Sequence, residues 1–349
     1  AGVFLVARLF PVFAISAPDA LSLVGYVGAI SALIAAIIAC TQTDIKRVLA
    51  YSTMSQIGYM MFALGVSKYG GEDGLGYTAS MFHLFTHAMF KALLFLGAGA
   101  VIHYIHSNEI KDMGGLRKYL PVTHFTFLIA CLAIAGVPGF FSKEEILLAA
   151  YQHKSTIYWI ALLTSGLTAF YMFRLYFSIF WGRTSPSPLE RGWGEAKSEG
   201  GFAMMMPLIL LAIGAAAAGF IPFGHIVSSD GRRLETEFHL MFSIAPVALG
   251  FAGIFIAMWM YKKQSDKPDK IAASVRGLYQ AAHHKFYIDE IYLFITQKII
   301  FNLIGRPAAW IDKNIVDGLM NATGNGTKGV AETIKRFQSG KVQSYAIYF

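Results

Sequence analysis

Apolar runs long enough to cross a membrane recur along this chain, and they constrain its fold more than any other feature. An α-helix rises about 1.5 Å per residue, so about 20 apolar residues span the hydrocarbon core of a bilayer. Runs of this length fall at 21–40, 48–66, 77–105, 156–181, 202–222 and 241–261, with a partial run at 1–17 and an interrupted one at 121–152. The sequence therefore predicts an all-α membrane protein, a polytopic bundle of transmembrane helices.

Composition excludes the main alternatives. Only 14% of the residues are charged, 55% are hydrophobic, and the mean hydropathy is +0.51. Soluble domains carry about 25% charged residues, so an ordinary soluble or disordered protein is excluded. The net charge of +8 does not indicate a nucleic-acid binder, because basic loops are usual on the cytoplasmic side of membrane proteins. The two cysteines, Cys40 and Cys131, lie in separate apolar runs and predict neither a disulfide framework nor a metal site.

The distribution of Lys and Arg between loops predicts the topology. Fourteen of these residues lie in the loops 41–47, 107–120, 182–201 and 262–285. Only four lie in the intervening loops 18–20, 67–76, 152–155 and 223–239. The positive-inside rule places the first set in the cytoplasm. We expect a multi-pass protein of a bacterial cytoplasmic (inner) membrane.

Segment 121–152 contains a helix breaker, Ala135-Gly136-Val137-Pro138-Gly139. A proline flanked by glycines is unfavourable inside a helix, so the pattern predicts one discontinuous helix with an unwound turn near 135–141. Open backbone at membrane depth requires cover from protein or a water-filled cavity and often marks an ion path. A simple kink, or two separate elements, is the structural alternative. Counting the segment as one span preserves the alternation of basic and non-basic loops.

The C-terminal part of the chain has a different pattern. After a transmembrane bundle at 1–262 and a basic cytoplasmic linker at 263–282, apolar residues recur at helical spacing among charges over 283–340. This predicts an amphipathic lateral helix on the cytoplasmic side, which Pro307 and the glycines at 324, 326 and 329 are expected to interrupt. Residues 341–349 are expected to start a truncated final transmembrane helix. The chain also opens inside an apolar run without a signal peptide, so we expect both ends to be truncated.

Ionisable side chains within the predicted spans are the main candidates for function. A charge at the bilayer centre costs about 2.5–3.5 kcal/mol or more, so it requires a reason. His83, His87 and Lys91 are spaced i, i+4, i+8 within the run 77–105, near one face of a helix. Because desolvation disfavours the charged form of lysine, this set is a candidate proton relay. The alternative is a structural lysine paired with a carboxylate, beside histidines satisfied by hydrogen bonds. A metal site is disfavoured because no third ligand lies nearby.

A second group, in the string GFFSKEEIL, follows the predicted break. Ser142 and Glu145 have the spacing of a capping box, which gives Glu145 a structural explanation. Lys143 has none, because the positive end of the helix dipole disfavours a cation there, so we expect it to face a polar cavity. We include Lys143 and Glu144 in the candidate relay.

A third group begins at TQTDIKR. Thr43 or Asp44 can cap the helix that starts near residue 45, and Asp44 can alternatively act as a pairing carboxylate on the entry side. The polar residues that follow, Ser52, Thr53, Ser55 and Gln56, are expected to contact another helix or water.

Four strings, in order, resemble the antiporter-like membrane subunits of respiratory complex I, NADH:quinone oxidoreductase. They are TDIKRVLAYSTMSQIGYM (43–60), HLFTHAMFKALLFL (83–96), MGGLRK (113–118) and GFFSKEEIL (139–147). Segment 283–340 is similar to the lateral helix of the distal, L-type subunits of that family. The resemblance implies that the chain covers the C-terminal half of such a subunit, with the second half-channel and without the first.

The resemblance also implies roles for individual residues. Lys91 matches the central-axis lysine, and His83 and His87 match the neighbouring relay histidines. Lys143 matches the broken-helix lysine on the exit side, and Asp44 the acidic residue of the TDIKR motif. No cofactor is implied for this chain, since NADH, FMN, iron–sulfur clusters and quinone bind other subunits. The implied partners are other membrane-arm subunits along the lateral helix, the lipid bilayer and protons or Na⁺, with no nucleic acid.

The leading hypothesis is a proton-translocating subunit of this oxidoreductase, an enzyme subunit without a redox centre of its own. The same motifs occur in the large subunit of multisubunit Na⁺/H⁺ antiporters, which is the first alternative. The second is a structural membrane brace in which the buried Lys and His side chains are only paired core residues.

Overall fold

The computed structural model describes residues 1–349 apart from 137–139, 183–198, 236–239, 339 and 348. The described residues form helices and turns and contain no strand, so the all-α prediction is confirmed. They divide into two compact units, Ala1–His283 and His284–Phe349. We call the first unit the bundle and the second the C-terminal unit.

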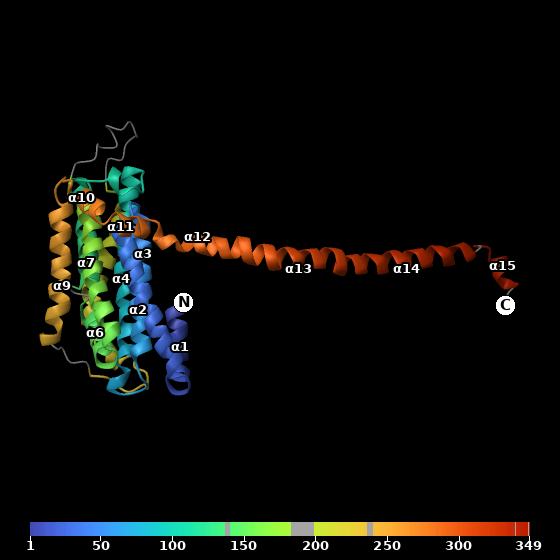
Figure 1. Cartoon of the computed structure of the whole chain (residues 1–349), viewed down its shortest axis with the longest axis horizontal. Coiled ribbons are helices and arrows are strands. Elements are labelled where there is room, and N and C mark those ends of the chain that lie inside the picture. The colour runs from blue at the N-terminus through green and yellow to red at the C-terminus, as the bar shows by residue number, and fades with distance from the viewer. Residues whose placement is uncertain (137–139, 183–198, 236–239, 339, 348) are drawn as a thin grey trace. The chain divides into compact units, whose positions relative to one another are not determined.

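The bundle consists of helices joined by loops and short 3₁₀ turns (Figure 1). Its α-helices are α1 (Gly2–Ser16), α2 (Pro18–Thr41), α3 (Ile45–Val66), α4 (Leu75–Ile105), α5 (Pro121–Ala135), α6 (Phe140–His153), α7 (Ser155–Phe180), α8 (Phe202–Ala217), α9 (Leu240–Tyr261), α10 (Lys267–Ser274) and α11 (Arg276–His283). By length and composition, five helical segments of the described chain can cross a membrane: 18–41, 72–105, 155–180, 202–220 and 242–261. The multi-pass membrane prediction is therefore confirmed. Helix α3 has spanning length, but its polar residues keep it out of this set.

Helices α2 and α3 pack against each other through glycines. A Cβ atom built on Gly65 would lie 2.3 Å from the Cα atom of Gly25, and one built on Gly58 would lie 2.6 Å from the carbonyl oxygen of Gly28. No side chain fits at such distances, so these positions allow the two backbones to touch. Close approach through small residues is a usual way to associate helices in a membrane, where apolar surface alone gives no preference for protein over lipid.

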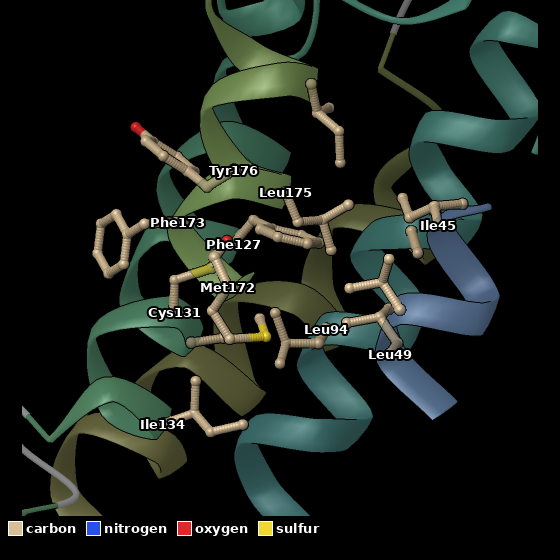
Figure 2. Packing of buried hydrophobic residues seen from close by; sticks show 14 of the residues in the cluster. Ile45, Leu49, Leu94, Phe127, Cys131, Ile134, Met172, Phe173, Leu175 and Tyr176 are labelled. Atoms are coloured by element: carbon tan, nitrogen blue, oxygen red, sulfur yellow. The ribbon is translucent and has the colours of Figure 1, made fainter. Parts of the chain in front are cut away.

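The largest buried cluster joins α3, α4, α5 and α7 (Figure 2). Figure 2 shows Leu49 of α3 and Leu94 of α4 facing Cys131 of α5 and Met172 of α7. Cys131 is a free, buried cysteine within this cluster, as expected from the sequence. The cluster holds these helices in a fixed arrangement around the polar residues described below.

The predicted interruption lies between α5, which ends at Ala135, and α6, which starts at Phe140. Gly136 follows α5 with φ +120°, a conformation that favours glycine. Residues Val137, Pro138 and Gly139, on which the predicted unwound turn depends, lie outside the described residues. The expected capping box is wrong, because α6 starts at Phe140 and Ser142 therefore lies inside its first turn.

The segment 263–282, expected as a linker, contains α10 and most of α11. Helix α11 contacts the end of α2, where His283 Nδ1 lies 3.2 Å from the carbonyl oxygen of Thr41. Arg174 of α7 donates to the carbonyl oxygens of Ala39 (3.3 Å) and Gln42 (2.9 Å) at the same end. Together these side chains satisfy carbonyl groups that a helix end leaves without intrahelical partners.

In the C-terminal unit, helical structure is continuous from Ile288 to Phe337, through α12 (Ile288–Leu293), the π-helical stretches η7 (Phe294–Gly305) and η8 (Asp312–Val316), α13 (Arg306–Ile311) and α14 (Asp317–Phe337). The expected interruptions are therefore wrong. Pro307 lies within this continuous stretch, at the junction of η7 and α13, and Gly305 before it has helical φ and ψ. The four glycines of α14, which include those at 324, 326 and 329, cost about 1 kcal/mol each in a helix but do not prevent it. A short helix, α15 (Val342–Ala346), follows.

Candidate functional site

His83, His87 and Lys91 form a buried column along α4. Their exposed fractions are only 1%, 8% and 5%. The two imidazole ring centroids are 6.2 Å apart, and the ring of Phe90 lies 6.1 Å from His83 and 5.3 Å from His87. We call these three residues the α4 column. The helical spacing read from the sequence thus corresponds to three ionisable side chains enclosed by protein.

The ammonium group of Lys91 binds a backbone carbonyl. Its Nζ donates to the carbonyl oxygen of Leu49 on α3 at 3.0 Å, and the hydroxyl of Thr53 donates to the same oxygen at 2.9 Å. Within the described chain Lys91 takes part in no ion pair. The structural alternative, in which this lysine is paired with a carboxylate, predicts a contact that is not present among the described residues.

His83 is hydrogen-bonded on both sides of its ring. Nε2 lies 3.0 Å from Oε1 of Gln56 on α3, and Nδ1 lies 3.0 Å from the hydroxyl of Ser142 on α6. With the amide oxygen of Gln56 as acceptor, Nε2 carries the proton and Nδ1 accepts from Ser142. Thr86 Oγ1 lies 3.4 Å from the same Ser142 hydroxyl. His83 therefore joins α4 to α3 and α6 through neutral polar groups.

Ser142 and Gln56 are the functional candidates that the sequence interpretation missed. Ser142 was assigned to a helix cap, and Gln56 to an unspecified polar contact. The positions of these two residues could have indicated a role at the site. Gln56 lies one helical turn after Ser52 in an apolar span, and Ser142 immediately precedes Lys143.

Lys143 is buried and binds the end of the neighbouring half-helix. Its Nζ donates to the carbonyl oxygen of Ile134 at 3.0 Å and lies 5.2 Å from the centre of the Tyr59 ring. Ile134 is in the last turn of α5, where the interruption leaves carbonyl groups without intrahelical partners. A cation at this end is favoured by the dipole of α5, which accounts for a lysine that the start of α6 disfavours.

Glu144 is also buried, and its Oε1 accepts a hydrogen bond from the hydroxyl of Ser243 on α9. Lys143 and Glu144 are adjacent in sequence and contact different helices, since Lys143 binds α5 and Glu144 binds α9.

Asp44 is the N-cap of α3. Its Oδ1 accepts from the backbone N–H groups of Lys46 (2.7 Å) and Arg47 (3.1 Å). This agrees with the capping interpretation of the sequence. These contacts lie within the first turn of α3 and do not reach the α4 column. The candidate site therefore consists of His83, His87, Lys91, Ser142 and Lys143, and Asp44 lies apart from it.

Comparison with known proteins gives a consistent picture. Residues 1–168 match the family described as NADH:quinone oxidoreductase/Mrp antiporter, TM. The NAD(P)H-quinone oxidoreductase chain 5 of Picosynechococcus sp. is 39% identical over 99% of this chain and 57% of its own length. The chloroplastic NAD(P)H-quinone oxidoreductase subunit 5 of Mesostigma viride is 38% identical over 99% of this chain and 55% of its own length. The chain thus spans about half the length of these curated relatives.

A solved structure shares the fold. It is the Mrp complex from Dietzia sp. DQ12-45-1b, in which one chain aligns with a TM-score of 0.54 at 21% identity, over 73% of this chain and 29% of that one. The helical bundle described above is therefore an arrangement that also occurs in a known membrane complex.

Proposed function

Because this chain is a homologue of the antiporter-like subunit 5 of NAD(P)H-quinone oxidoreductases, we propose that it is a proton-translocating membrane subunit of such an oxidoreductase. The observation that carries the proposal is the nature of the partners of the buried lysines. Lys91 and Lys143 bind the carbonyl oxygens of Leu49 and Ile134 and no described carboxylate. A buried carboxylate would hold the proton on a lysine, whereas a neutral carbonyl leaves the lysine able to release it.

The proposed path connects the two lysines through the histidines. It runs between Lys91 and His87, along α4 to His83, and through the hydroxyl of Ser142 to α6, where Lys143 follows. The contacts of His83 support this order, since its ring links α4 to Ser142. Next to Lys143, Glu144 accepts a hydrogen bond from the hydroxyl of Ser243, and this pair extends the set of polar groups to α9.

Two buried polar atoms beside the proposed path support the presence of water molecules there. Nε2 of His87 and Nε2 of Gln56 are buried and have no hydrogen-bond partner among the described residues. Buried polar atoms are normally hydrogen-bonded, and an ordered water molecule is a common partner. We assign water molecules as the links between His87 and its neighbours.

The remaining parts of the proposal concern the rest of the complex. The chemistry of NADH, FMN, iron–sulfur clusters and quinone is assigned to other subunits, and the motion of protons in this chain is coupled to that chemistry. The C-terminal unit is the proposed partner-binding element, because its helix exposes apolar side chains such as Phe294, Trp310 and Leu319. The membrane is the energy-conserving membrane of the source organism, for which we retain the bacterial cytoplasmic membrane.

The experiment compares Lys91→Met with wild type in the complete, purified complex reconstituted in proteoliposomes. We expect the number of protons translocated per NADH oxidised to fall while assembly is retained. Lys111→Met is the matched control, because Lys111 is exposed and lies outside the α4 column. Repeating the assay with and without Na⁺ distinguishes a proton path from a Na⁺/H⁺ exchanger. A normal proton ratio in an assembled Lys91→Met complex would contradict the proposal and favour the structural brace.

A further inference from the structure

Two cations lie against the indole ring of Trp181, at the ends of three helices. The guanidinium carbon of Arg117 is 3.9 Å from the centre of its indole ring, and Nζ of Lys262 is 4.8 Å from the same ring. Trp181 follows α7 directly, Lys262 follows α9, and Arg117 lies in the 3₁₀ turn Leu116–Lys118 just before α5. Since α7 and α9 contain candidate membrane spans, this cluster lies at a membrane–water boundary.

The cluster is held by backbone and side-chain contacts. The N–H of Gly115 donates to the carbonyl oxygen of Trp181 at 2.9 Å, which fixes the turn that carries Arg117 to the end of α7. The indole N–H of Trp181 faces the hydroxyl of Tyr176 at 3.5 Å. The ring therefore has a defined position, and both cations are placed relative to it.

The two cations of this cluster have no ion-pair partner within the part of the chain that the structure describes. The acidic residue Glu199 accepts from the backbone N–H groups of Val122 (2.9 Å) and Thr123 at the start of α5, and it makes no described ion pair with Arg117 or Lys262. Two cations that share one ring repel each other, and an anion beside them removes that cost.

We propose that Arg117, Trp181 and Lys262 bind the phosphate group of an anionic phospholipid. A guanidinium group offers a planar pair of donors to phosphate, and an ammonium group adds a second charge. Tryptophan favours the headgroup level of a bilayer, where such a phosphate lies. Basic pockets at the ends of transmembrane helices recognise anionic headgroups by this chemistry.

A free phosphate ion has the same chemistry, but the surroundings favour a lipid. An apolar groove of about 510 Å³ lies between α5 and α8. Its lining includes Pro121, Val122 and Phe125, at the end of α5 that follows Arg117. This groove offers an acyl chain an apolar surface at the same level of the membrane.

The test measures how much phosphatidylglycerol the complete complex retains. Wild type and variants are purified, exchanged into vesicles of phosphatidylcholine and phosphatidylglycerol in a 9:1 ratio, extracted with mild detergent and analysed by native mass spectrometry. Each basic residue near an anionic membrane surface contributes about a fivefold gain in affinity. We therefore expect Arg117→Gln with Lys262→Gln to bind phosphatidylglycerol about 30-fold more weakly than wild type.

The control is Lys267→Gln. Lys267 lies 4.1 Å from the centre of the Trp259 ring, a cation–aromatic pair that involves one cation. Its loss should lower retention by no more than the about fivefold effect of a single surface charge. The charge-retaining pair Arg117→Lys with Lys262→Arg should keep most of the binding, which separates charge from misfolding. Equal retention by wild type and the glutamine double variant would overturn the proposal. So would displacement of the lipid by a modest excess of inorganic phosphate, which would identify a free-anion site.

Discussion

The hydroxyl of Ser142 is the sharpest test of the path from α4 to α6. It lies 3.0 Å from Nδ1 of His83, and both side chains are buried. Ser142→Ala removes this hydroxyl and takes a hydrogen-bond partner from Nδ1 of the buried His83 ring. A lost hydrogen bond of this kind costs about 1 kcal/mol, and an unsatisfied buried group up to about 3 kcal/mol. We expect fewer protons to be translocated per NADH oxidised, because the link between His83 and α6 is lost.

The assay is the proton-to-NADH ratio of the complete complex in proteoliposomes, at matched assembly. Ser80→Ala is the matched control, because Ser80 lies on α4 with His83, is equally buried and donates only to the carbonyl oxygen of Met60, at 2.8 Å. Each variant loses one buried hydroxyl, so both should lose some stability. Only Ser142→Ala should lower the proton ratio. If both variants translocate protons like wild type, Ser142 is not part of the path and the argument from its geometry is refuted.

Three further predictions concern packing, capping and pH. Gly65→Ala should lower the melting temperature of the assembled protein, because its Cβ would lie 2.3 Å from the facing backbone and overpacking costs about 1–3 kcal/mol. The control Gly99→Ala should leave the melting temperature unchanged, because its Cβ meets no atom within 4 Å. Equal melting temperatures for the two variants would contradict the packing account. Asp44→Ala should cost about 1 kcal/mol of stability through the lost helix cap, whereas Asp44→Asn should retain the cap. The number of protons translocated per NADH oxidised should be unchanged in both variants. A lowered ratio in assembled Asp44→Ala would instead favour the entry-side role. The backbone N–H groups of Arg232 and Gly71 hold the pKa of the Asp230 carboxyl below its ordinary value, so this contact stabilises the fold above that value and is lost as pH falls through the lowered pKa. The hydrogen-exchange protection of the Gly71 amide should therefore fall below about pH 4 in wild type, and should be absent at every pH in Asp230→Ala.

Much of the fold follows from the sequence because membrane spans depend on local composition. A helix of apolar residues satisfies its own backbone, so length and hydropathy predict most of the bundle without tertiary information. The α4 column follows from spacing alone, since i, i+4 and i+8 lie near one face of any helix. The interruption in 121–152 follows from proline and glycine chemistry, although its central residues lie outside the described structure.

The details that sequence reasoning missed depend on contacts between helices. The start of α6 at Phe140 makes Ser142 a partner of His83, and no local rule predicts which helix faces a serine hydroxyl. The partner of Lys143 is the carbonyl oxygen of Ile134, on another half-helix. In the C-terminal unit, the sequence predicts an interruption at Pro307, but helical structure continues through it at the junction of η7 and α13.

Because Lys91 and Lys143 bind carbonyl oxygens, the site can keep its geometry when a lysine changes charge. A neutral amine still has N–H groups, so Lys91 and Lys143 can donate to Leu49 and Ile134 in both protonation states. A carboxylate partner would behave differently, since loss of the proton from lysine would leave an unpaired buried charge and a cost of several kcal/mol. Each lysine can therefore change charge without losing its position. The energy for that change must then come from a nearby charge or from water rather than from breaking an ion pair, which agrees with the coupling proposed above.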